Sequence, residues 1–166
     1  IKPRISGAAW GTHLMEPGRR LSDEDWRLLE AAGALVQEFV AEIGDGEISL
    51  MYIEGSFSHA VRKVAAPGDF RVQSDFGGTV EPFAPDAAVQ SFGDRVLAAT
   101  PAVWRYARID LVITARGPVL MELEIIEPDL FLGFGRDAPG RLAGVLITDA
   151  LMAESGAERN LKEPVA

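Results

Sequence analysis

Charged and apolar residues alternate along two neighbouring segments in the second half of the chain, and most of the charged residues are acidic. Segment 108–112 reads Arg-Ile-Asp-Leu-Val, and segment 121–127 reads Met-Glu-Leu-Glu-Ile-Ile-Glu. Successive side chains of a β-strand point to opposite faces, so the charges of each segment share one face. We therefore expect Asp110, Glu122 and Glu124 to form one carboxylate patch.

The stretch between these strands decides which residues face one another. Residues 115–117, Ala-Arg-Gly, suit a three-residue hairpin turn with glycine in the left-handed position. This turn sets Asp110 opposite Glu122, and Arg108 opposite Glu124. Apolar residues then pair on the other face: Ile109 with Leu123, Leu111 with Met121, and Ile113 with Val119. A two-residue turn would not keep the charged pairs on one face and the apolar pairs on the other, so we expect a turn of three residues.

Facing carboxylates create an electrostatic conflict that needs an explanation. Two carboxylates directly opposite each other on a sheet repel. A shared cation removes the conflict, and Mg²⁺ prefers hard oxygen ligands. The pattern therefore favours a metal–nucleotide site. The alternative is that the three acidic residues form a solvated, charged face of the sheet.

Composition narrows the function classes. The 166 residues suit about one domain, and the net charge of −9 disfavours nucleic-acid binding, which needs clustered Lys and Arg. The absence of cysteine excludes disulfides, thiolate nucleophiles and cysteine–zinc sites. No apolar run approaches the roughly 20 residues of a membrane span, so a cytoplasmic protein without a membrane partner is the default. His13 and His59 each lack a partner at metal-ligand spacing, and we interpret both as structural.

The expected elements alternate helices with hairpins. A helix begins after Ser22 and ends at Gly33, and a short strand-like run follows. The remaining elements are strands at about 47–53 and 56–63, a helix at 86–99, the carboxylate hairpin at about 105–127 and a helix at about 139–154. The first hairpin sets Glu47 opposite Arg62. This order predicts an α+β fold with mostly antiparallel sheet.

Two cationic residues outside the hairpin could contact phosphates. Lys2 lies on a strand just before the glycine-rich loop 6–12, where an ammonium group and backbone N–H groups could hold phosphates. Arg71 is expected on a strand with Gln73 on the same face, ahead of a Gly-Gly pair. It could stabilise the charge that develops on a transferred phosphoryl group. The alternative for Arg71 is a structural ion pair.

Taken in order, these elements resemble the ATP-grasp superfamily, nearest to the prokaryotic glutathione synthetase-like ATP-binding domains. The resemblance runs from Lys2 to about Phe131. It implies that Lys2 contacts the α- and β-phosphates of ATP. It also implies that Gln37, through its side chain, and Glu38 and Val40, through their backbones, bind adenine in a hinge segment.

The resemblance assigns the remaining site residues as well. Glu47 would hold the ribose hydroxyls, and Arg71 would approach the γ-phosphate and an acyl-phosphate intermediate. Asp110, Glu122 and Glu124 occupy the places of the metal ligands, which in the family are an Asp and a Glu-x-Asn motif. Glu124 thus replaces the usual Asn, which keeps an oxygen ligand and adds a charge.

The implied fold is an ATP-grasp fold with mostly antiparallel sheets and flanking helices, with the N-terminal substrate domain missing. Because the chain opens in what reads as the middle of a strand, we expect a piece of a longer polypeptide. Residues 1–40 would be the remainder of the smaller subdomain, with the phosphate loop and hinge. Residues 41–154 would be the C-terminal subdomain with the metal site, and 155–166 a polar tail.

The implied activity is that of an ATP- and Mg²⁺-dependent carboxylate–amine (or carboxylate–thiol) ligase with an acyl-phosphate mechanism. Its partners would be small-molecule carboxylate and amine substrates, and a homo-oligomer is compatible with it. One alternative is a nucleotide- or metal-binding module without activity of its own. Another is an acidic interaction domain without a ligand, in which mutation of the carboxylate face would raise stability.

Overall fold

The computed structural model describes residues 1–7 and 9–155, so all but the first residue of the expected tail 155–166 lies outside it. Helices and strands follow one another in this order: β1 (Lys2–Pro3), α1 (Asp23–Ala32), β2 (Ala34–Leu35), β3 (Glu47–Ile53), β4 (Ser56–Val64), β5 (Thr79–Phe83), α2 (Ala87–Ala98), β6 (Tyr106–Thr114), β7 (Gly117–Glu124) and α3 (Ala138–Ser155). Among these described residues, no helix has the length and apolar character needed to cross a membrane.

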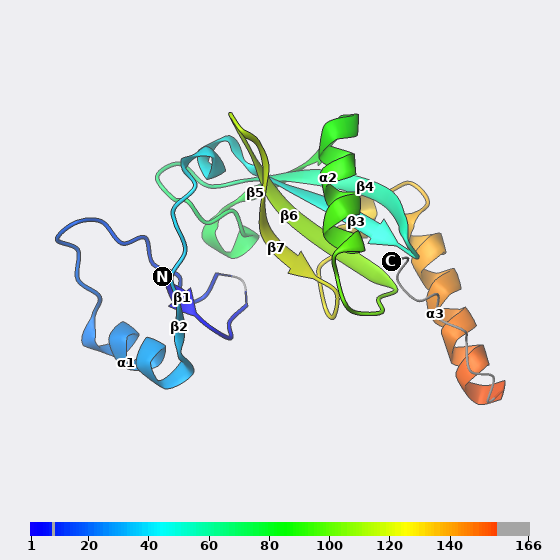
Figure 1. Cartoon of the computed structure of the whole chain (residues 1–166), viewed down its shortest axis with the longest axis horizontal. Coiled ribbons are helices and arrows are strands. Elements are labelled where there is room, and N and C mark those ends of the chain that lie inside the picture. The colour runs from blue at the N-terminus through cyan, green and yellow to red at the C-terminus, as the bar shows by residue number, and fades with distance from the viewer. Residues whose placement is uncertain (8, 156–166) are drawn as a thin grey trace.

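The strands form two antiparallel sheets of unequal size. β1 and β2 make a two-stranded ladder beside α1, and this small unit lies to the left of the main sheet in Figure 1. The main sheet has five strands in the order β5-β4-β3-β6-β7, and every neighbouring pair is antiparallel. The expected α+β fold with mostly antiparallel sheet is therefore confirmed.

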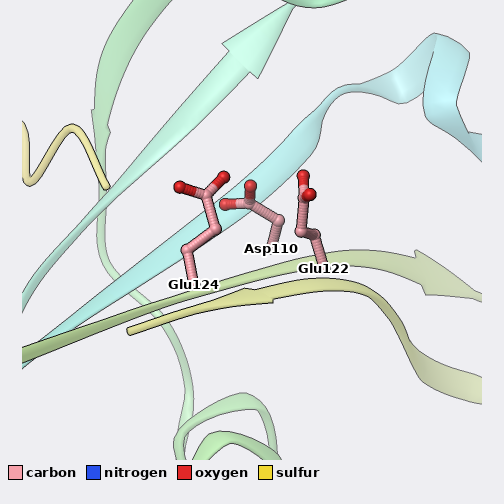
Figure 2. A group of neighbouring side chains, drawn as sticks. All are labelled: Asp110, Glu122 and Glu124. Atoms are coloured by element: carbon pink, nitrogen blue, oxygen red, sulfur yellow. The ribbon is translucent and has the colours of Figure 1, made fainter. Parts of the chain in front are cut away.

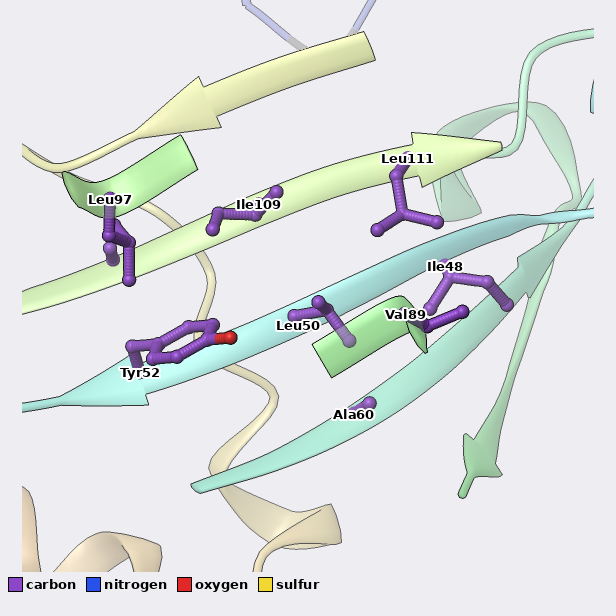
Figure 3. Packing of buried hydrophobic residues seen from close by; sticks show 9 residues of the cluster. Ile48, Leu50, Tyr52, Ala60, Val89, Leu97, Ile109 and Leu111 are labelled. Atoms are coloured by element: carbon purple, nitrogen blue, oxygen red, sulfur yellow. The ribbon is translucent and has the colours of Figure 1, made fainter. Parts of the chain in front are cut away.

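One face of the main sheet is apolar and is covered by α2. The even-numbered residues of β3, which are Ile48, Leu50 and Tyr52, point to this face. They pack with Ile109 and Leu111 of β6 and with Val89 and Leu97 of α2 (Figure 3). Gly93 brings the helix close, because a Cβ there would lie 2.5 Å from the Tyr52 hydroxyl oxygen. The helix expected at 86–99 is confirmed, with Asp86 as its N-cap.

The opposite face carries the odd-numbered residues of β3 and has a mixed character. At one end Ile53 packs against Ala138 and Val145 of α3. At the other end Val112 of β6 packs against Ile43 and other buried side chains. Glu47, Ser49, Asp110 and Lys63 are buried on the stretch between these apolar ends. The fold thus encloses a polar segment between apolar contacts on a single sheet face.

The carboxylate hairpin differs from the prediction in its turn and contains a β-bulge. Thr114 pairs with Gly117, so the turn has two residues and not three, and the register shifts between Asp110 and Leu111. The extra residue on β7 is Met121. Beyond the bulge the pairs are those expected, Asp110 with Glu122 and Arg108 with Glu124, and also Ile109 with Leu123. The expected pairs of Leu111 with Met121 and Ile113 with Val119 are wrong.

A second bulge makes the pairing of β3 with β4 differ from the prediction. Glu47 pairs with Lys63 and not with Arg62, because the register shifts between Met51 and Tyr52. Ser58 is the extra residue, since Met51 pairs with His59 and Tyr52 with Phe57. Each residue of β4 beyond the bulge therefore moves by one place relative to β3, which brings Lys63 beside Glu47.

Two further expectations need correction. Arg71 lies in an irregular segment that leads into the 3-10 turn Ser74–Phe76, and not on a strand. Asp69 explains this, because its carboxylate accepts hydrogen bonds from the backbone N–H groups of Phe70 and Arg71, which a strand would offer to a neighbour. The strand-like run after Gly33 is limited to the two residues of β2.

Candidate functional site

The three carboxylates of the hairpin converge on one side of β6 and β7 (Figure 2). Asp110 comes from β6 and is 2% exposed, whereas Glu122 and Glu124 come from β7 and are more accessible. One oxygen from each residue lies within 4.8 Å of the others. Three carboxylate oxygens at this spacing are a donor set that suits a hard divalent cation such as Mg²⁺.

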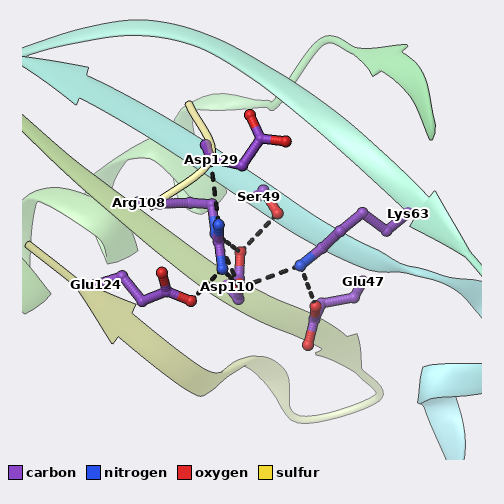
Figure 4. Close-up of polar contacts among 7 residues, drawn as sticks. All are labelled: Glu47, Ser49, Lys63, Arg108, Asp110, Glu124 and Asp129. Atoms are coloured by element: carbon purple, nitrogen blue, oxygen red, sulfur yellow. Dashed lines mark hydrogen bonds and ion pairs between the residues drawn. The ribbon is translucent and has the colours of Figure 1, made fainter. Parts of the chain in front are cut away.

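Two protein cations lie among these carboxylates (Figure 4). Lys63 of β4 is 5% exposed. Its Nζ lies 2.5 Å from Glu47 Oε2 and 3.1 Å from Asp110 Oδ2. Arg108 contacts Glu124 and donates from Nε to both oxygens of Asp110 at 3.1 Å. From the sequence, a metal ion was expected to offset the repulsion between the facing carboxylates. Lys63 and Arg108 already offset part of this repulsion.

Charge counting shows that this relief is incomplete. The ionised forms of Glu47, Asp110, Glu122 and Glu124 carry four negative charges, and Lys63 and Arg108 carry two positive ones, which leaves −2. That deficit equals the charge of one divalent cation. The residues present therefore fit a Mg²⁺ ion in both donor type and charge.

The pKa values follow from burial and from this excess of negative charge. Burial, and then the neighbouring Asp110, raise the pKa of Glu47 above its usual value. Burial also raises the pKa of Glu124, although Arg108 works in the opposite direction. For Lys63 burial lowers the pKa, but Asp110 and Glu47 outweigh it, and the net direction is upward. The ammonium group of Lys63 is therefore held charged inside the sheet face.

Three residues of this network were not among the site residues expected from sequence. Ser49 donates a hydrogen bond to Asp110 at 2.6 Å, and Arg108 and Lys63 form the ion pairs. Arg108 could have been found, because the same alternation that selects Asp110 puts it on the polar face. Lys63 could not, because the bulge at Ser58 changes its register.

Arg71 lies in a different part of the site. Its guanidinium group pairs with Asp69 at 2.7 Å and stacks on the Phe76 ring, with Cζ 3.6 Å from the ring centroid. Hydrogen bonds from Arg71 hold the pKa of Asp69 well below its usual range. The structural ion pair that was the alternative for Arg71 is therefore present.

Arg71 nevertheless also lines a pocket. The pocket has a volume of about 590 Å³. The glycine-rich loop forms another wall of it through Trp10, Gly11 and Thr12. Arg19 lines the pocket as well, and so do Glu24 and Asp25, so the lining carries charges of both signs.

The residues expected to bind the nucleotide are spread over the small unit and the segment that follows it. Lys2 pairs with Leu35 across the β1–β2 ladder, and Gln37 and Glu38 are exposed. Val40 packs against a buried cluster of the main sheet. Among the described residues, the ion pairs that reach Asp110 come from Lys63 and Arg108, and not from Lys2 or Arg71. The structure thus joins Glu47 to Asp110 through Lys63.

Comparisons with known proteins find relatives that are named as probable ligases. A probable α-L-glutamate ligase of Shewanella pealeana is 32% identical over 89 residues, which cover 54% of this chain and 19% of the relative. A probable α-L-glutamate ligase of Parasynechococcus marenigrum is 32% identical over 142 residues, which cover 80% of this chain and 28% of the relative. The chain therefore spans about a fifth of the length of the first relative and little more than a quarter of the second.

A solved structure and a family model extend this likeness. The crystal structure of D-cycloserine synthetase DcsG matches with a TM-score of 0.61 and 27% identity, over 74% of this chain and 45% of that one. A family model described as the RimK-like ATP-grasp domain matches residues 22–130, a range that contains the carboxylates, Lys63, Arg71 and Arg108. The chain belongs to the RimK-like ATP-grasp family, and its α+β architecture is that of an ATP-grasp fold.

Proposed function

We propose that this chain is the ATP-binding catalytic part of an ATP- and Mg²⁺-dependent carboxylate–amine ligase. The observation that carries the proposal is the convergence of three carboxylate oxygens within 4.8 Å, inside the range that matches the RimK-like domain. The relatives named as α-L-glutamate ligases favour an amino acid as one substrate, since glutamate offers both a carboxylate and an amine.

Asp110, Glu122 and Glu124 are the residues that would hold the metal ion. When bound, the ion would neutralise the negative charge of the nucleotide phosphates. Arg108 contacts both Asp110 and Glu124, and Lys63 contacts both Asp110 and Glu47, so the two cations offset part of the repulsion among these carboxylates. These two residues therefore lower the electrostatic cost of assembling the site before a ligand arrives.

The nucleotide would extend from this patch toward the small unit. We propose that Lys2 contacts the α- and β-phosphates, and that Gln37, Glu38 and Val40 bind adenine. Glu47 is proposed to hold the ribose hydroxyls. Because its carboxylate is bonded to Lys63 at 2.5 Å, it must share or release this bond to do so.

Arg71 is proposed to act at the reacting phosphoryl group. An oxygen of the substrate carboxylate attacks the γ-phosphorus, ADP leaves, and an acyl phosphate forms. The amine then attacks the acyl carbon, phosphate leaves, and the amine loses a proton. Arg71 lines the pocket with the glycine-rich loop and would stabilise charge on the transferred group. This chemistry requires no nucleophile from the protein, which suits a chain without cysteine.

Trapping of the acyl phosphate tests the proposal. The chain, with the remaining part of its protein added in trans if needed, is incubated with ATP, Mg²⁺, glutamate and hydroxylamine. Hydroxylamine converts an acyl phosphate to a hydroxamate, so ATP-dependent hydroxamate is the expected product, and Asp110→Asn should abolish it. Metal-dependent ATP binding without hydroxamate or phosphate release would favour the alternative, a nucleotide-binding module without activity of its own.

A further inference from the structure

Ser49 is a buried hydroxyl that the proposed reaction does not use. It lies directly opposite Asp110 on the neighbouring strands β3 and β6, so both side chains point to the polar face. Ser49 is 0% exposed and Asp110 is 2% exposed. The Ser49 hydroxyl donates to Asp110 Oδ1 at 2.6 Å, as Figure 4 shows, and this distance is typical of a charge-assisted O–H···O⁻ bond.

Arg108 contacts both oxygens of Asp110, whereas Ser49 and Lys63 each contact one of them. Oδ1 accepts hydrogen bonds from Ser49 Oγ and Arg108 Nε. Oδ2 lies 3.1 Å from Lys63 Nζ and 3.1 Å from Arg108 Nη2. Ser49 is thus the neutral donor among these partners, and it acts on one oxygen only.

The three donors also differ in how firmly they are placed. Lys63 and Arg108 have long side chains and each also contacts a second carboxylate, so both can shift when a cation enters. Ser49 has a short side chain on a strand that is paired on both sides, which fixes the position of its Cβ. Its hydroxyl therefore orients the carboxylate of Asp110 without adding positive charge that would repel a divalent cation.

We propose that Ser49 is a positioning residue of the metal site. Its hydroxyl holds Oδ1 and so fixes the plane of the Asp110 carboxylate relative to Glu122 and Glu124. The inference rests on the proposed function, because it requires that a divalent cation binds at these three residues. Ser49 itself touches neither the metal ion nor the substrate.

Binding of Mn²⁺ tests this role without any measurement of activity. Mn²⁺ takes the same hard oxygen ligands as Mg²⁺, and its free aqueous ion gives an electron paramagnetic resonance signal that is lost on binding. Ser49→Ala is expected to weaken Mn²⁺ binding about 10- to 100-fold, as is typical when a partner of a metal ligand is removed. Ser49→Thr keeps the hydroxyl and is expected to stay within about threefold of the wild-type chain.

Two further variants keep the test decisive. Ser56→Ala is the matched control, because Ser56 is exposed at the far end of the same hairpin, and it should bind like wild type. Ser49→Cys keeps the side-chain size but is a weak donor, so it should bind more weakly than wild type even if Ser49→Ala does not fold. Urea unfolding without metal establishes that each variant is folded.

The outcomes separate this inference from the proposed function. If wild type binds Mn²⁺ and folded Ser49→Ala or Ser49→Cys binds equally well, the positioning role is overturned and the metal site stands. A loss of stability without a change in Mn²⁺ affinity would equally overturn it, since that result is expected of a merely structural hydrogen bond. If wild type does not bind Mn²⁺, both the metal site and the role of Ser49 are overturned.

Discussion

The two faces of β3 are buried in opposite ways. Ile48, Leu50 and Tyr52 pack against α2 through apolar contacts, whereas Glu47 and Ser49 on the other face are buried among charged groups. Apolar burial stabilises a fold by about 1.5–3 kcal/mol for each large side chain. Buried ion pairs contribute little net stability, because desolvation offsets their attraction. One strand thus carries an apolar face that stabilises the fold and, on its other face, the buried charged groups beside the metal site that we propose.

This comparison predicts that the faces respond differently to mutation. Changes on the apolar face should lower stability and leave metal binding alone. Changes on the polar face should affect metal binding, and they should lower stability strongly only where they leave a buried charge without its partner. The four predictions below test this distinction.

The largest effect is expected for Lys63→Met. The substitution keeps most of the side-chain volume but leaves Glu47 and Asp110 buried without their shared cation. Breaking such a pair typically lowers the free energy of unfolding by about 3–5 kcal/mol, which urea denaturation would measure. Lys2→Met, in the small unit, is the matched control and should change it by less than about 0.5 kcal/mol. A loss below about 1 kcal/mol for Lys63→Met would contradict the role assigned to this lysine.

Leu50→Ala breaks the other face. Leu50 is 0% exposed in the cluster under α2, so truncation leaves a cavity, and a loss of about 3 kcal/mol is expected in urea denaturation. Mn²⁺ affinity of the folded protein should stay at the wild-type value, because the side chain points away from the carboxylates. A parallel loss of Mn²⁺ affinity would show that the two faces are not independent.

A pH dependence distinguishes Tyr52 from its apolar neighbours. Burial, and then the hydrogen bond to Asp94, raise the pKa of Tyr52 well above its usual value. The folded state therefore keeps a proton that the unfolded state releases, so this stabilisation is complete below about pH 10 and is lost as the pH rises further. In urea denaturation between about pH 9 and 11, wild type should lose up to about 1.4 kcal/mol per pH unit more than Tyr52→Phe. Equal slopes for both proteins would contradict the assignment.

The smallest effect is expected for Glu124→Asn. The Glu124 side chain is 29% exposed and already pairs with Arg108, and asparagine would still offer one oxygen to a metal ion. Mn²⁺ affinity should fall by less than about tenfold, whereas Asp110→Asn should fall further because Asp110 is the buried centre of the network. Equal losses in the two variants would show that the charge of Glu124 is essential.

The sequence predicted the polar face well where alternation alone decides it. Period-two patterning placed Arg108, Asp110, Glu122 and Glu124 on one face, and the pairs Asp110–Glu122 and Arg108–Glu124 are confirmed. The turn was wrong, but the bulge at Met121 compensates for it by one residue. The correct pairing was therefore reached although the predicted turn was incorrect.

A bulge also made the predicted pairing of the hairpin β3–β4 wrong. The strands expected at about 47–53 and 56–63 leave Glu54 and Gly55 as the turn, and the structure has this turn. The bulge at Ser58 nevertheless places Lys63, and not Arg62, beside Glu47. No residue type near Ser58 indicates a bulge. The position of Lys63 beside Glu47 could therefore not be predicted from the alternation of residue types. The prediction that Arg71 lies on a strand was wrong because Asp69 accepts hydrogen bonds from the backbone N–H groups of Phe70 and Arg71. The alternation of residue types carries no information about this local competition.

Calorimetric titration with ATP shows whether the carboxylate face binds a metal–nucleotide complex, as we propose. The wild-type chain and the variant Asp110→Asn with Glu122→Gln are each titrated once with Mg²⁺ and once with a chelator. We predict saturable binding that requires Mg²⁺ in the wild type and is lost in the double variant. Binding that is unchanged by the chelator, or equal in the two proteins, would rule out the proposed metal–nucleotide site.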